Sequence, residues 1–167
     1  LLESNLRAVE QFKEAGGRFT AATGRIHRDM LRAMPDAATL FNAPAILSNG
    51  ACLYDFSRGE TLSERTIEPS LVRDVMRFVG VYAKAHGDDV GVRISAAEGF
   101  VADPACRNPY IVRDMTNAAR YGTAVTAPFD SWHLEMLHLY KIVVRGDAEA
   151  IARVRPLIEA EFGDVLT

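Results

Sequence analysis

Thr23, Gly24 and Arg25 stand where a short run of small and apolar residues gives way to a helical pattern, and together they suit an anion. A strand that ends in Thr-Gly and passes into a helix presents backbone N–H groups and a hydroxyl at the carboxyl edge of a sheet, where open α/β sheets bind ligands. The N–H groups and positive dipole end of a helix N-terminus suit a phosphate there. This arrangement predicts a phosphate site.

Each residue of the tripeptide has a role to which its chemistry is suited. Thr23 could donate its hydroxyl to a phosphoryl oxygen, and Arg25 could supply charge or brace a loop. Gly24 would let a ligand approach the backbone. The tripeptide alone leaves a second interpretation open, in which Thr23 only caps the helix and Gly24 is a turn glycine.

The segments around this tripeptide predict a βαβ unit. Apolar residues recur at helical spacing on both sides of it, and a compact apolar run, of the kind buried on both faces of a parallel sheet, ends at Asn49-Gly50. The expected elements are a helix over 4–15 capped by Ser4 or Asn5, a strand over 18–23, a helix over 26–34 and a strand over 44–49.

After Asn49 and Gly50 the pattern is that of a separate α+β domain. The expected elements are a hairpin of residues 51–56 and 61–67, a helix over 70–86, strands over 90–95 and 99–103, a short helix near 109–119, a strand over 137–146 and a last helix over about 147–162. We therefore expect an α/β fold, with residues 1–50 forming part of a doubly wound core. Residues 51–145 form the α+β domain, and 146–167 its last helix and the start of a return to the core.

Composition narrows the possible partners. The net charge of −3, without a basic block, argues against nucleic acid, whose phosphate backbone requires a dense cationic surface. No stretch approaches the roughly 18 apolar residues that span a bilayer, so we expect no membrane partner. Cys52 and Cys106 are far apart and form no CxxC pair, which favours reduced cysteines in a cytoplasmic protein.

The order of these features resembles the haloacid dehalogenase (HAD) superfamily, and more narrowly its Cof-type, class IIB branch of sugar-phosphate phosphatases. The resemblance covers essentially the whole chain and is strongest over residues 5–72. It rests on AVEQFKEAGGRFTAATGR, on the apolar strand that leads into SNGACLYD, and on ERTIEPSLVRDVMRF. It implies a partial Rossmann-like HAD core followed by an α+β class IIB cap domain.

The resemblance also assigns roles to residues. In the family, a Thr at the place of Thr23 contacts the transferring phosphoryl group, and the Asn-Gly at Asn49-Gly50 marks where the chain leaves the core for the cap. Phosphate or substrate contacts are therefore expected from Thr23 to Arg25 and from Asn49-Gly50. Candidate substrate contacts in the cap are Arg93, Arg107 and His133, together with Asp103 and Asn108.

The implied reaction is Mg²⁺-dependent hydrolysis of a small phosphorylated metabolite, with sugar phosphates as the expected substrates, through an aspartyl-phosphate. The family's catalytic aspartates precede the helix at residue 4, and its lysine and acidic Mg²⁺ motif follow the cap. Neither block occurs in the sequence, so we predict no metal ligand within it and expect it to be an incomplete view of the enzyme.

Two other classes of protein stay open. Taken at face value, a chain without nucleophile or metal ligands is a non-catalytic module that binds or senses a phosphorylated ligand. A protein-interaction domain is the third possibility, supported only by the α+β portion. The presence of a DxDGT motif and an acidic motif in the natural polypeptide separates the first alternative from the enzyme.

Overall fold

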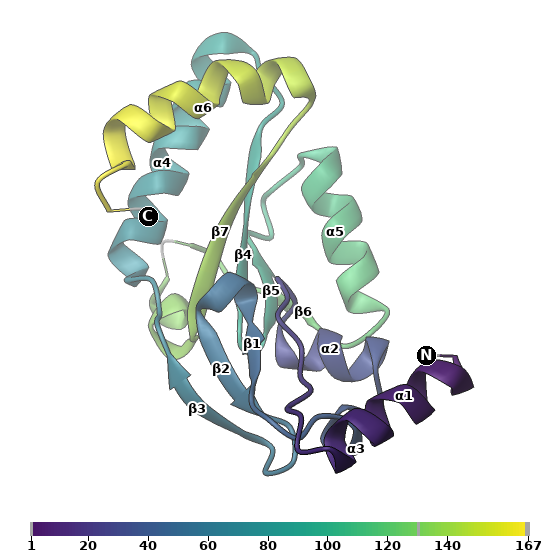
Figure 1. The fold of residues 1–167 in the computed structure, drawn as a ribbon. Coiled ribbons are helices and arrows are strands. Elements are labelled where there is room, and N and C mark those ends of the chain that lie inside the picture. The colour runs from purple at the N-terminus through teal and green to yellow at the C-terminus, as the bar shows by residue number, and fades with distance from the viewer. Residues whose placement is uncertain (1, 130, 166–167) are drawn as a thin grey trace. The chain divides into compact units, whose positions relative to one another are not determined.

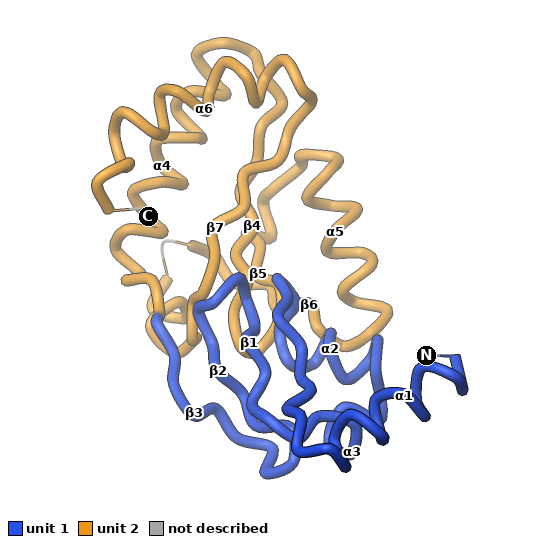
Figure 2. The backbone as a smooth tube through the Cα atoms, viewed as in Figure 1, with its two compact units in different colours: residues 1–65 blue, residues 66–167 orange. Residues whose placement is uncertain are grey.

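The computed structural model describes residues 2–129 and 131–165 (Figure 1). The chain divides into two compact units, Leu1–Arg65 and Thr66–Thr167 (Figure 2). In the described residues, no helix combines the length and the apolar character that a bilayer span requires.

The first unit combines short helices with a three-stranded antiparallel sheet in the order β1-β2-β3. Its elements are α1 (Glu3–Glu14), α2 (His27–Ala33), α3 (Ala37–Leu40), β1 (Ala45–Leu47), the 3-10 turn η1 (Ser48–Gly50), β2 (Cys52–Asp55) and β3 (Glu60–Glu64). Strands β2 and β3 confirm the predicted hairpin. Both belong to the sheet of β1, so the compact unit extends to Arg65, whereas the sequence pattern predicted a boundary after residue 50.

The segment predicted as a strand over 18–23 is extended but forms a single parallel bridge, between Ala22 and Ile46. The bridge consists of hydrogen bonds from the Ile46 N–H to the Ala21 carbonyl and from the Thr23 N–H to the Ile46 carbonyl, both of 2.9 Å. The parallel pairing does not continue from Ile46 back to Pro44, because Pro44 has no N–H to donate. On the other side, the backbone turns at η1. The prediction of a full strand is wrong for these reasons.

The start of α1 also differs from the prediction. The helix begins at Glu3 with Leu2 at its N-cap, and no side chain caps it. Ser4 and Asn5 therefore lie inside the first turn, and the prediction that one of them caps the helix is wrong. A cap residue has an extended backbone, which a residue within a helical turn does not have.

The second unit is a four-stranded sheet in the order β6-β5-β4-β7, in which only β5 and β6 pair in parallel. Figure 1 shows α4 and α6 together on one face and α5 on the other. The elements are α4 (Pro69–His86), β4 (Gly91–Ala96), β5 (Gly99–Ala102), α5 (Pro109–Ala119), β6 (Ala124–Thr126), the 3-10 turn η2 (Trp132–Met136), β7 (Leu139–Arg145) and α6 (Ala148–Phe162). These confirm the elements predicted from residue 70 onward; β6 was not predicted, since three residues show no period.

Successive side chains of β4 point alternately to the two faces of this sheet. Val92, Ile94 and Ala96 belong to the hydrophobic core that also contains α4 and α6 residues. Successive strand residues point to opposite faces. Arg93 and Ser95 therefore face α5, so this second face carries polar side chains beside apolar ones such as Phe100.

Asp88 joins the two helices of the apolar face. It accepts hydrogen bonds from the Tyr82 hydroxyl of α4, at 2.7 Å, and from the Arg153 guanidinium of α6, at 3.1 Å for Nε. The hydrogen bonds from Arg153 and Tyr82 lower the pKa of Asp88. The folded state therefore favours the charged carboxylate more strongly than the unfolded state does.

Because the pKa of Asp88 is lowered in the folded state, the stability that its carboxylate contributes depends on pH. The contribution is fully present above the unfolded aspartate pKa of about 3.9 and is lost as pH falls through the lower folded pKa. We expect Asp88→Asn to lower the Tm at pH 7, and the difference from wild type to shrink as pH falls through the folded pKa of Asp88, which lies below the unfolded one. Calorimetry across this pH range measures it, with the exposed Asp36→Asn as control; a difference independent of pH would contradict the assignment.

Candidate functional site

Two loops of the first unit lie side by side, joined through their backbones. Residues 23–25 form one of them, called the TGR loop below, and Ser48–Gly50 form the other, called the SNG turn. The Asn49 N–H donates to the Thr23 carbonyl at 3.2 Å, and the Ser48 N–H donates to the Arg25 carbonyl at 3.0 Å. The structure thus brings together all five residues that the sequence predicted as phosphate or substrate contacts in the core.

Most residues of the two loops are exposed, so a ligand could contact them. Gly24, Arg25, Asn49 and Gly50 are exposed, and Thr23 is half-buried. The Thr23 Oγ1 accepts a hydrogen bond of 3.3 Å from the Arg25 N–H. A hydroxyl has one hydrogen to donate besides its acceptor lone pairs. Thr23 therefore keeps a donor for a phosphoryl oxygen while its oxygen closes the loop.

The backbone of the SNG turn is left-handed at three successive residues. The φ angles are 53° at Ser48, 60° at Asn49 and 98° at Gly50. Gly50 adopts such an angle without steric cost, and Asn tolerates it, but Ser does so less readily. Ser48 is also buried, at 3% exposure. Sequence reasoning missed this residue, because no local pattern predicts a left-handed serine.

Two of the cap candidates are buried, Asn108 at 5% exposure and Arg93 at 9%. The Arg93 Nε donates to Asp114 of α5 at 3.2 Å, its Nη1 donates to the Ser95 hydroxyl at 3.2 Å, and its guanidinium lies 4.1 Å from the centroid of the Phe100 ring. Arg145 of β7 binds the same carboxylate through Nε and Nη2 at 2.9–3.0 Å. Arg93 therefore braces α5 against the sheet.

Besides burial, the positive charge of Arg93 affects the pKa of a neighbouring side chain, that of Lys141. Lys141 of β7 lies opposite Ser95 in the strand pairing. Burial and, after it, the positive charge of Arg93 lower the pKa of Lys141. Asp114 and Arg145 were not predicted as partners of Arg93. The spacing of residues in α5 could have indicated Asp114, because it lies three residues after Ile111 on the face of α5 that packs on the sheet.

Arg107 and His133 have other partners. Arg107 is exposed, and its Nη1 donates to the carbonyls of Pro104 and Cys106 at 2.9 and 3.2 Å. His133 is exposed on η2, with its Nδ1 3.0 Å from the Ser131 Oγ and its ring stacked on Trp132 at a centroid distance of 4.3 Å. Arg93, Arg107 and His133 lie in a strand, a loop and a turn, and their roles as substrate contacts stay predictions.

Asp103 and Asn108 support the loops around α5. Asp103 accepts hydrogen bonds from the N–H groups of Ala105 and Phe129, at 2.7 and 3.3 Å. Asn108 is buried and caps α5 by accepting from the Ile111 N–H, while its amide donates to Asp89. Both side chains thus have structural partners.

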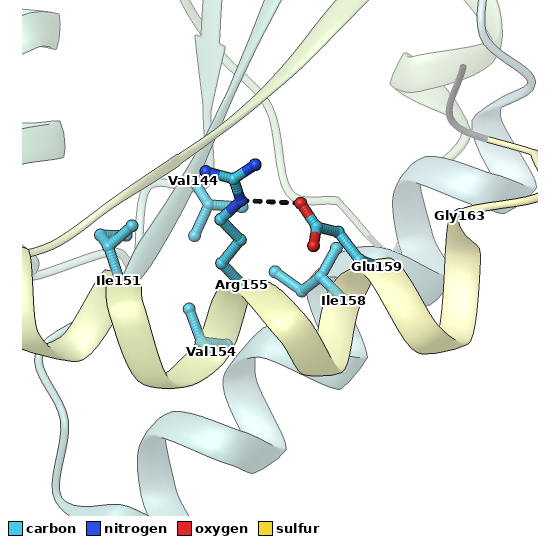
Figure 3. A pocket seen from close by; sticks show the side chains of 7 residues that line it. All are labelled: Val144, Ile151, Val154, Arg155, Ile158, Glu159 and Gly163. Carbon is cyan, nitrogen blue, oxygen red and sulfur yellow. Dashed lines mark hydrogen bonds and ion pairs between the residues drawn. The ribbon is translucent and has the colours of Figure 1, made fainter.

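A cavity of about 300 Å³ lies between β7 and α6 in the second unit (Figure 3). Its lining is mostly apolar, and its residues are Val144, Ile151, Val154, Arg155, Ile158, Glu159 and Gly163. The Arg155 Nε donates to Glu159 at 2.7 Å. Because the two charged side chains bind each other, we assign this cavity no part in phosphate chemistry.

The described residues do not supply a magnesium site. Mg²⁺ binds through carboxylate and other oxygen ligands. Within residues 2–129 and 131–165, no three His, Cys, Asp or Glu side chains gather where they could hold a metal ion. We therefore assign no Mg²⁺ ligand among the described residues and derive no step through the ion.

Comparison with known families identifies the family to which the chain belongs. Residues 1–167 match the sequence profile of the haloacid dehalogenase-like hydrolases, so the chain belongs to that family. Its branch is the Cof-type class IIB group, as the resemblance of the TGR and SNG segments predicted. The family generally needs Mg²⁺. No curated protein matches the chain significantly.

Solved structures share the fold at low sequence identity. A phosphatase of the superfamily, BT1666 from Bacteroides thetaiotaomicron, superposes with a TM-score of 0.69 and 18% identity over 95% of this chain and 54% of its own. A Thermotoga maritima protein, TM0651, gives 0.70 and 16% over 99% and 57%. The subclass IIB sugar phosphatase BT4131 gives 0.64 and 16% over 93% and 55%. The chain thus spans about half the length of these proteins.

Proposed function

We propose that the protein is a phosphatase that hydrolyses small phosphorylated metabolites, with sugar phosphates as the leading substrate class. Membership of the hydrolase family supports the reaction type. The observation that carries the proposal is the pairing of the TGR loop with the SNG turn through two backbone hydrogen bonds. This pairing gathers a hydroxyl, a cation and exposed backbone around one place.

In the proposed reaction, an aspartate carboxylate attacks phosphorus and forms an aspartyl-phosphate. The bond from phosphorus to the leaving alkoxide breaks, and a second aspartic acid gives the alkoxide its proton. Water then releases inorganic phosphate and regenerates the carboxylate. Such transfer depends on electrostatic stabilisation of the three equatorial oxygens, because the transition state spreads negative charge over them. Thr23 would donate its hydroxyl to one of these oxygens, and Arg25 would supply positive charge beside the loop.

The arrangement of core and cap is part of the proposal. Residues of the first unit that precede β2 would belong to the phosphate-binding core, and the sheet of the second unit to a cap that selects the leaving group. The exposed polar side chains of the second unit support this assignment, since a selecting surface needs donors and charges. Arg107 and His133 are exposed and would be available to a substrate.

The test is an assay of the intact protein, with Mg²⁺ added, for release of inorganic phosphate from p-nitrophenyl phosphate and a panel of sugar phosphates. We expect hydrolysis that chelation with EDTA abolishes and Mg²⁺ restores. Binding of a phosphorylated compound by calorimetry without hydrolysis would replace the proposal with the non-catalytic, phospho-ligand-binding alternative. Neither binding nor hydrolysis across the panel would refute both.

A further inference from the structure

Ser48 and its neighbour Asn49 are left-handed without being glycines, and of the two Ser48 tolerates this conformation less readily. In the part of the chain that the structure describes, positive φ angles occur at glycines, such as Gly16, Gly59 and Gly87, and at Ser48 and Asn49. A residue with a Cβ atom in the left-handed region is strained, and such strain persists only where the surroundings enforce it. Glycine would relieve it. Ser48 therefore has a backbone whose cost glycine avoids elsewhere in the same chain.

The side chain of Ser48 adds a second cost. The residue is 3% exposed, and in the described residues its Oγ has no hydrogen-bond partner. A buried hydroxyl without a partner is unfavourable, and such groups call for an explanation. Both costs fall on one residue beside the TGR loop. Strained, incompletely satisfied residues gather at functional sites, where the strain serves pre-organisation.

The conformation of Ser48 sets the position of the TGR loop. With Ser48 and Asn49 both left-handed, two successive N–H groups reach the carbonyls of Arg25 and Thr23. These hydrogen bonds hold the backbone on both sides of Gly24. The burial of Ser48 and the two N–H hydrogen bonds hold it in this conformation, whereas a glycine there would have more accessible backbone conformations than a residue with a Cβ atom.

We infer that Ser48 is a positioning residue, which fixes the Thr23 hydroxyl for catalysis through its rigid left-handed backbone and not through its own hydroxyl. The inference rests on the proposed function, because it concerns the same site. Misplacement of a catalytic group by about 1 Å can cost on the order of 10²-fold in rate. A loosened SNG turn should therefore lower kcat more than it changes KM.

Two substitutions in the intact protein separate the backbone from the hydroxyl. Ser48→Gly removes both the strain and the restriction, and we expect kcat for p-nitrophenyl phosphate to fall about tenfold, with KM within about twofold and no loss of Tm. Ser48→Ala removes only the hydroxyl, and we expect kcat to be retained and Tm to rise. An unchanged kcat in Ser48→Gly, or an equal loss in Ser48→Ala, would overturn the inference.

Ser63→Gly is the matched control, because Ser63 is exposed in β3 and belongs to neither of the two loops. We expect it to lower Tm and leave kcat unchanged, the reverse of Ser48→Gly. A structural role alone for Ser48 would make the two variants behave alike.

A readout independent of activity separates this inference from the proposed function. Hydrogen-exchange mass spectrometry of peptides covering residues 20–27 should show faster exchange in Ser48→Gly than in wild type, and wild-type rates in Ser48→Ala. If wild type hydrolyses no phosphate ester, the proposed function fails, and faster exchange in Ser48→Gly still supports the positioning of the loop. Unchanged exchange overturns the inference whether or not the enzyme is active.

Discussion

Thr23→Ala is expected to lower kcat for phosphate-ester hydrolysis on the order of 10²–10³-fold, the typical effect of removing one donor that stabilises an oxyanion. Thr23 is half-buried, and its Oγ1 accepts from the Arg25 N–H at 3.3 Å, so its hydrogen is the part that a phosphoryl oxygen would use. The ground state gains less from this donor than the transition state does. Steady-state kinetics of the intact protein should therefore show a much smaller change in KM.

Two controls make the Thr23 result specific. Thr23→Ser keeps the hydroxyl and should retain most of the activity, while Thr61→Ala removes a hydroxyl from an exposed position in β3 and should change nothing. Circular dichroism and Tm identify any loss caused by unfolding. Thr23 does not cap α2, whose N-cap is Ile26 without a side-chain hydrogen bond, so the capping interpretation of the tripeptide is wrong. A Thr23→Ala variant that is folded and has the kcat of wild type would show that the Thr23 hydroxyl only closes the loop by accepting from the Arg25 N–H.

Asp114→Ala is expected to have the largest effect on stability, a loss of about 3 kcal/mol in the free energy of unfolding. Its carboxylate is 14% exposed and accepts hydrogen bonds from Arg93 and Arg145, which lie on neighbouring strands. Removing it leaves two guanidinium groups near each other, one of them in a side chain only 11% exposed. Urea denaturation followed by circular dichroism measures the change.

Asp74→Ala is the control for this prediction. Asp74 pairs with Arg77 on the surface of α4, where the side chains are 55% and 73% exposed. Exposed pairs contribute about 0–1 kcal/mol. A double variant, Arg93→Met with Asp114→Leu, should recover part of the loss, because apolar residues often replace a buried ion pair without cost. A loss in Asp114→Ala no greater than that in Asp74→Ala would mean that the carboxylate does not brace α5.

The two largest predictions concern residues of different compact units, Thr23 in the first and Asp114 in the second. Thr23→Ala should leave Tm nearly unchanged. A variant of each kind thus separates chemistry in the first unit from stability in the second.

The sequence predicted well where one element's own pattern decides its structure. The helix α4 shows apolar residues at helical spacing, a leading Pro69 and a terminal Gly87, and the structure places it at Pro69–His86. Such signals are local, since spacing selects the buried face and proline and glycine set the ends. The hairpin of β2 and β3 was predicted for the same kind of reason.

The prediction was weaker where hydrogen bonds between distant segments decide. The run over 18–23 has the composition of a strand, but its ladder depends on the N–H groups of a segment more than twenty residues away, and Pro44 lacks one. The three residues of β6 became a strand only because β5 offers a parallel partner. Their own sequence is too short to predict it.

The candidate site also combines features that the sequence predicted with features that only the tertiary structure decided. By itself, the sequence determined the residue types of the TGR and Asn-Gly segments and their places in the chain, one just before a helix and the other just after an apolar strand. Only the tertiary structure decided that Ser48 is left-handed and buried beside them, and that Arg93 binds Asp114. Backbone strain and charge pairing depend on which segments meet in space, and residue spacing along the chain does not contain that information.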